Sequence, residues 1–205
     1  MSAARPGVNR DAAAYSLYCA CANGNLRAAQ QLHLEFAFTR EEALEEGTDA
    51  FRGACSEGHL GVAQWLRSEF AITREDVLRY NELAIIVDYD TFADACASGR
   101  LDVAQWLQAT FALTLEEMTR CDSLAFRLAC IGCHLDVARW LQAFDMKSAY
   151  LFGRDAQPML AGGSTQMHDF IYSLYRDRAP WFGNALAEAN YEAARARAAC
   201  QHDVT

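Results

Sequence analysis

A segment of about 34 residues occurs four times in this chain of 205 residues, and this repeat constrains the fold more than any other feature. The copies align on an alanine–cysteine pair, and three of them continue with the pattern Leu-x-Val-Ala-x-Trp-Leu. The steps between equivalent cysteines (55 − 21, 96 − 55 and 130 − 96) are 34, 41 and 34 residues. A period of this length predicts stacked helical units that together bury a continuous core. The equivalent cysteines are Cys21, Cys55, Cys96 and Cys130.

Each copy has the pattern of two helices joined by a tight turn. In the second copy, Phe51, Ala54 and Cys55 stand at positions i, i+3 and i+4, which lie on one face of a helix. The residues from Leu60 to Leu66 keep the same helical spacing of apolar positions. The intervening glycine is expected to adopt the left-handed conformation that ends a helix. The equivalent glycines are Gly24, Gly58 and Gly99. The predicted fold class is therefore all-α.

A threonine with an acid three residues later follows the second helix in the first three copies. Such a pair predicts a capping box, in which hydroxyl and carboxylate satisfy backbone N–H groups at the start of a further short helix. In the fourth copy Ser148 takes the threonine position, but Leu151 replaces the acid, so the box is lost. The pairs are Thr39 with Glu42, Thr73 with Asp76 in a weaker version, and Thr114 with Glu117.

The motif Ala-Cys-x-x-Gly-His-Leu-x-Val-Ala-Gln-Trp-Leu, followed by Phe-x-Leu-Thr, resembles the ankyrin repeat family, in particular the divergent repeats common in giant viruses and some protists. The resemblance covers residues 13–151 and implies a short ankyrin-like solenoid of about four repeats. The Thr-Pro-Leu-His start of standard ankyrin repeats is absent from every copy. Tetratricopeptide repeats share the period, but they place tryptophan in the first helix and a proline near the end of the unit. Here tryptophan falls in the second helix, as at Trp65.

Two copies depart from the shared pattern at single positions. The first copy has Gln31 where the others carry tryptophan, which suits a terminal repeat with one face toward water. The fourth copy has Cys133 at the glycine position of the turn.

Two regions lie outside the repeat pattern. The step of 41 residues is seven longer than the other two, and the additional residues lie within the segment 80–91. We favour a long connection whose Leu83, Ile85 and Ile86 pack under the stack. The alternative is a modified finger that presents Asp88, Tyr89 and Asp90 to a partner, because binding residues often lie on loops. Residues 152–205 are expected to form a helical cap or a degenerate fifth repeat, with a helix from His168 to Arg176; a separate effector segment is the alternative.

The sequence from Cys130 to His134 matches C-x-x-C-H, the attachment motif of c-type haem. In the repeat alignment, however, Cys130 is a core cysteine, and His134 matches His59 at a turn, where a structural role is expected. Zinc is disfavoured because most cysteines lie one repeat apart rather than in C-x-x-C groups. No phosphate-binding loop, dinucleotide fingerprint or hydrolase motif occurs in the sequence. We therefore expect no cofactor, no metal and no enzymatic activity.

Charge and hydropathy narrow the partner class. The chain carries 18 basic and 27 acidic residues, a net charge of −9, and no run of lysine or arginine, which disfavours binding to nucleic acid. No apolar stretch approaches the roughly 18 residues of a membrane span, and the N-terminal residues lack the apolar core of a secretory signal. These observations predict a cytoplasmic monomer that does not bind membranes, in a host cell if the chain is viral.

The ankyrin resemblance implies a protein-binding module or adaptor that uses its first helices and the fingers between repeats. A partner with a basic patch would suit the acidic surface. The alternatives are an adaptor whose C-terminal helices recruit a second assembly, such as a ubiquitin ligase, and a metal-binding, haem-binding or enzymatic C-terminal segment. The candidate partner-binding residues are Asp49, Arg52, Glu57, Asp90, Asp94, Ser98, Arg127 and Ile131.

Overall fold

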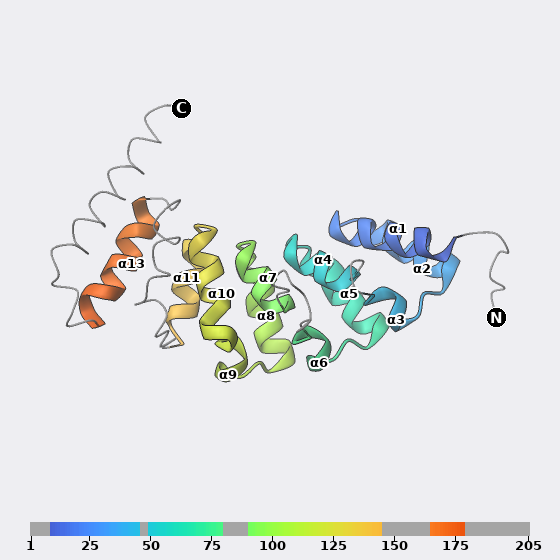
Figure 1. Cartoon of the computed structure of the whole chain (residues 1–205). Coiled ribbons are helices and arrows are strands. Elements are labelled where there is room, and N and C mark those ends of the chain that lie inside the picture. Colours follow the sequence, from blue (N-terminus) through green and yellow to red (C-terminus); the bar gives the residue numbers. More distant parts are fainter. Residues whose placement is uncertain (1–8, 46–48, 80–89, 145–164, 179–205) are drawn as a thin grey trace, which may run out of the picture. The chain divides into compact units, whose positions relative to one another are not determined.

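The computed structural model describes residues 9–45, 49–79, 90–144 and 165–178. These residues form helices joined by turns, with no strand among them, so the all-α class is confirmed (Figure 1). The chain divides into two compact units, residues 1–117 and 118–205. Most of the segment 80–91 lies outside the described residues, as does Ser148, where the capping box is predicted to be lost.

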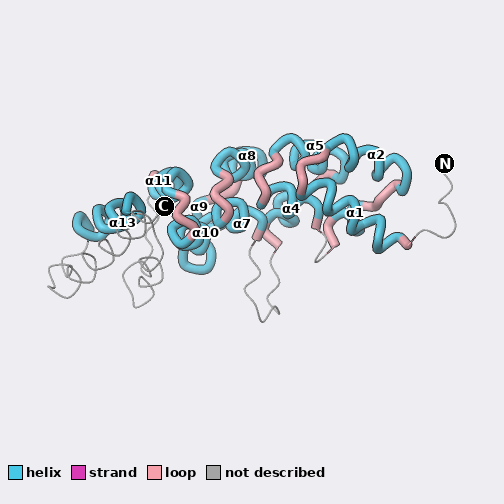
Figure 2. Tube along the Cα trace, turned by 90° about the horizontal axis from the view of Figure 1, so that it is seen from above, coloured by secondary structure: helices cyan, strands magenta, loops and turns pink. Residues whose placement is uncertain are grey.

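The first unit repeats one arrangement three times: two helices and then a helix of four residues. First helices pack against their successors, α1 on α4 and α4 on α7, and each packs on the second helix of its own copy. Seen from above, α2, α5 and α8 form one row, beside α1, α4 and α7 (Figure 2). The short helices confirm the helical turn that the capping boxes predict. The helices are α1 (Arg10–Ala22), α2 (Leu26–Phe36), α3 (Arg40–Ala43), α4 (Ala50–Ser56), α5 (Leu60–Phe70), α6 (Arg74–Val77), α7 (Thr91–Ala97), α8 (Leu101–Phe111) and α9 (Leu115–Met118).

The capping boxes take the predicted form. In the first copy, the Glu42 carboxylate accepts the backbone N–H of Thr39 at 2.8 Å, and the Thr39 hydroxyl accepts the backbone N–H of Glu42 at 3.3 Å. Thr114 and Glu117 form the same two bonds. These bonds satisfy N–H groups that the first turn of a helix leaves without an intrahelical partner.

The turn between the two helices of a copy depends on its glycine. Gly24, Gly58 and Gly99 have φ angles of +70°, +84° and +71°, as predicted. The residue after the turn in the following copy lies against this glycine. A Cβ atom on Gly24 would meet the His59 ring at 2.5 Å, and one on Gly58 would meet the side chain of Arg100 at 2.8 Å. The glycine therefore provides both the left-handed conformation and the space for the neighbouring copy.

The core of both units is built from the repeated apolar positions. Phe51 and Leu66 of the second copy are 1% and 0% exposed. The equivalents of Phe51 in the other three copies are buried, and so are those of Leu66 in the third and fourth copies, whereas Leu32 of the first copy is half-buried. The four repeated cysteines lie in this core with free thiols, so the predicted core packing of these cysteines is confirmed. Burial raises the pKa of the Cys21 and Cys130 thiols to about 12 and holds those of Cys55 and Cys96 well above the ordinary range.

These buried thiols should resist alkylation in the folded protein. Iodoacetamide reacts with the thiolate, so a raised pKa and lack of access both slow the reaction. At pH 8 we expect Cys133, which is half-exposed, to be modified while Cys55 and Cys96 remain unmodified, as measured by mass spectrometry of peptides. Unfolding in denaturant is the control and should make all of them reactive. Modification of Cys55 at the rate of Cys133 would contradict the core placement.

The second unit contains α10 (Arg120–Ile131), α11 (Leu135–Gln142) and α13 (Thr165–Arg178). The turn between α10 and α11 matches the earlier turns although Cys133, with φ +61°, replaces the glycine. The backbone N–H of His134 donates to the carbonyl of Ala129 at 2.8 Å, as that of His59 does to Ala54 in the second copy.

The helix predicted from His168 to Arg176 lies within α13. This helix packs on α11 and buries Met167 and Ile171, which are four residues apart on one helical face. The guanidinium of Arg139 lies 6.0 Å from the ring centroid of Phe170. No helix in the described ranges is long and apolar enough to cross a membrane.

Candidate protein-binding site

Two of the residues predicted to bind a partner act as helix N-caps. The carboxylate of Asp49 accepts the backbone N–H of Arg52 at 2.9 Å at the start of α4. That of Asp90 accepts the backbone N–H of Ala93 at 2.7 Å at the start of α7. Aspartate is favoured at such positions because its carboxylate satisfies an N–H group without an intrahelical partner. An N-cap role accounts for both residues without reference to a partner.

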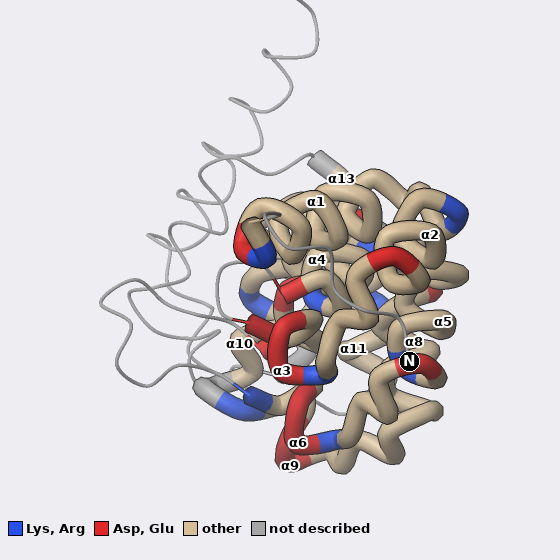
Figure 3. Tube along the Cα trace, turned by 90° about the vertical axis from the view of Figure 1, so that its right-hand side faces the viewer, with Lys and Arg blue, Asp and Glu red and all other residues tan. Residues whose placement is uncertain are grey.

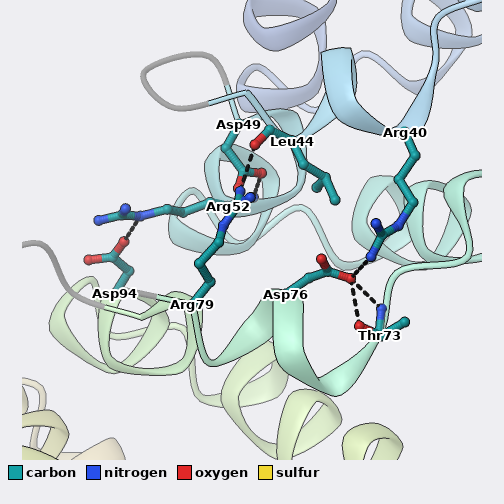
Figure 4. A network of polar contacts seen from close by, with 8 residues as sticks. All are labelled: Arg40, Leu44, Asp49, Arg52, Thr73, Asp76, Arg79 and Asp94. Atoms are coloured by element: carbon teal, nitrogen blue, oxygen red, sulfur yellow. Dashed lines mark hydrogen bonds and ion pairs between the residues drawn. The ribbon is translucent and has the colours of Figure 1, made fainter. Parts of the chain in front are cut away.

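Arg52 and Asp94, also predicted as partner-binding residues, pair with each other between α4 and α7 (Figure 4). Arg79 lies beside this pair, with its guanidinium 3.5 Å from the carboxylate of Asp49 and its N–H donated to the carbonyl of Leu44 at 2.6 Å. Burial raises the pKa of Asp49, and the N-cap bond and the two arginines oppose that change. The network joins all three copies of the first unit through partly buried charges.

The other predicted residues are more accessible. Glu57 and Ser98 occupy the C-cap positions of α4 and α7, and Glu57 is largely exposed, with its carboxylate 3.6 Å from the guanidinium of Arg100. In the second unit, Arg127 is half-buried, and Ile131 is 49% exposed. The accessible part of the predicted site is therefore smaller than the sequence indicated, and Glu57 and Ile131 are its most exposed residues.

A series of arginine–carboxylate pairs along the short helices was not predicted. In the first copy, the Arg10 guanidinium donates two hydrogen bonds to the Glu42 carboxylate, at 2.6 and 2.8 Å. Arg40 of α3 pairs with Asp76 of α6, and Arg74 of α6 pairs with Glu117 of α9. We call these three pairs the arginine ladder. A sequence signal existed, because Arg40 and Arg74 each directly follow the threonine of a capping box.

Arg10 completes the ladder at its first position. The helix that carries it, α1, has 13 residues, whereas α4 and α7 have seven each. The additional N-terminal residues of α1 place Arg10 against Glu42, as Arg40 is placed against Asp76. The Glu42 carboxylate is therefore paired with an arginine of its own copy.

The short helices also bring acidic residues together on one part of the first unit (Figure 3). Each carries two acids, and only α3 and α6 carry an arginine. The bonds from Arg10 and Arg74 lower the pKa values of Glu42 and Glu117 to about 2. These carboxylates therefore remain ionised throughout the neutral range. The more exposed acids are Glu41, Glu75 and Glu116.

The Arg10–Glu42 pair should make the stability of the first unit depend on pH in the acid range. Because the pKa of Glu42 falls from an ordinary 4.5 to about 2 on folding, its stabilisation is complete above pH 4.5 and is lost as the pH falls toward 2. Arg10 is 44% exposed, so screening by solvent should keep the contribution of the pair small. Glu42→Gln should lower the free energy of unfolding at pH 7 but not at pH 2, as measured by urea denaturation.

Glu45→Gln is the matched control, since it removes an exposed carboxylate from the same connection. This variant should keep the pH dependence of the wild type. If the pH profiles of Glu42→Gln and the wild type superimpose, the pair does not contribute in solution.

The geometry does not favour the C-x-x-C-H motif as a haem attachment site. Cys130 is fully buried and Cys133 is half-exposed, so the two thiols are not presented together. Among the residues that the structure describes, no group of three histidine, cysteine or acidic side chains is placed to hold a metal ion.

The sequence matches no protein-family model and no curated protein.

Proposed function

We propose that this chain is a protein-interaction module built from ankyrin-like repeats, which binds a partner protein through its first helices and the segments that precede them. One observation carries the proposal. The C-cap positions of the four first helices are structurally equivalent, yet they hold four different residues: Asn23, Glu57, Ser98 and Gly132. Two residues earlier, each helix has the same buried cysteine. Constant buried positions beside variable accessible ones are expected of a repeat scaffold that presents a binding surface.

Charge supports a partner with a basic patch. The net charge is −9, and the short helices add an acidic surface in the first unit. Complementary charges speed association and orient the partners, and salt screens them over roughly 10 Å at 0.1 M ionic strength. Binding of the purified partner should therefore weaken as salt is raised.

The thiols support an intracellular location. Four cysteines are buried singly in the repeated core instead of forming disulfides with one another. Free core cysteines are typical of proteins in a reducing compartment. We therefore place the proposed interaction inside the cell.

The structure changes which variants can test the proposal. Arg52→Glu is a poor probe, because it would place a carboxylate against Asp94 and disturb the packing of α4 on α7. Glu57→Lys is better suited, since Glu57 is exposed and its ion pair with Arg100 is long, at 3.6 Å. Gln64→Lys is the matched control, because it adds the same cation at an exposed position of the second helix α5.

The experiment is cross-linking and affinity capture from the native cell, followed by titration of the purified pair. A partner that binds the wild type and Gln64→Lys should bind Glu57→Lys at least about tenfold more weakly, a difference of 1.4 kcal/mol. Circular dichroism and thermal melting must first show that both variants are folded. If Glu57→Lys and Ile131→Asp both keep every partner of the wild type at full affinity, the proposed surface is wrong.

A further inference from the structure

We draw no further inference here: the strongest candidate, the acidic surface that Glu41, Glu75 and Glu116 form along the short helices α3, α6 and α9, carries nothing because the described residues hold no bound group or buried unpartnered side chain that indicates a ligand there.

Discussion

Replacing Phe51 with alanine is expected to lower the free energy of unfolding by about 3–5 kcal/mol, the usual range for a buried phenylalanine. Phe51 is 1% exposed in α4. Its ring centroid lies 6.2 Å from that of Trp106 and 6.3 Å from that of Phe111, both in the next copy. The substitution would leave a cavity between two copies and remove both aromatic contacts. Urea denaturation followed by circular dichroism measures the loss.

Tyr15→Ala is the control for this prediction. Tyr15 is also an aromatic residue of a first helix, but it is 57% exposed. Its replacement should change the free energy of unfolding by no more than about 0.5 kcal/mol, as is usual for surface positions. If Phe51→Ala costs no more than Tyr15→Ala, the contact between the second and third copies is not the one described.

The second large effect is expected at the turn of the first copy. Gly24→Ala should lower the free energy of unfolding by about 2 kcal/mol or more, for two separable reasons. An L-residue at a φ of +70° costs about 1–2 kcal/mol. The added Cβ would also lie 2.5 Å from Nδ1 of His59, so the ring of the second copy must move. Denaturation of the single variant gives the sum of these two costs.

A double-mutant cycle separates the two costs. In the His59→Ala background the ring is absent, so Gly24→Ala should retain only the backbone cost of about 1–2 kcal/mol. If the cost of Gly24→Ala is the same in both backgrounds, the His59 ring does not rest on Gly24.

Cys133 offers the reverse change, because it adopts a φ of +61° at the equivalent turn. Cys133→Gly removes that strain and should raise stability, by about 1 kcal/mol at most, because glycine also gains freedom in the unfolded chain.

Local features of the fold were predictable from the sequence. The helical spacing around Phe51 and Cys55, the turn at Gly58 and the box at Thr39 each depend on residues within a few positions of one another. Local preferences and tertiary packing agree at these positions, so the pattern identifies the structure. The conformation of Cys133 could not be predicted from the preference of cysteine itself. Its φ of +61° is one that cysteine rarely adopts, and the turn at this position of the repeat imposes it.

The charged contacts between copies were not predicted, and this changed the interpretation of the candidate site. Arg52 and Asp94 are 42 residues apart, and Arg74 and Glu117 are 43 apart. In a single sequence, such residues are recognised only as polar positions that differ between copies. Residues of a binding surface have the same two properties, so the sequence does not distinguish the two roles. Asp49 was interpretable from local rules, because an aspartate directly before a helix is a favoured N-cap.

The arginine ladder has a consequence for how a destabilising substitution in one copy affects the stability of its neighbours in the first unit. Its second and third pairs each join one copy to the next, as do the contacts of His59 with Gly24 and of Phe51 with Trp106. Such contacts predict nearest-neighbour cooperativity, in which a copy is stabilised by its own folding and by its interfaces with adjacent copies. Because α4 contacts both α1 and α7, a destabilising substitution in the second copy would weaken two interfaces at once. Hydrogen exchange that is fastest in α1 and α2 and slowest in α4 and α5 would be the kinetic signature of this arrangement.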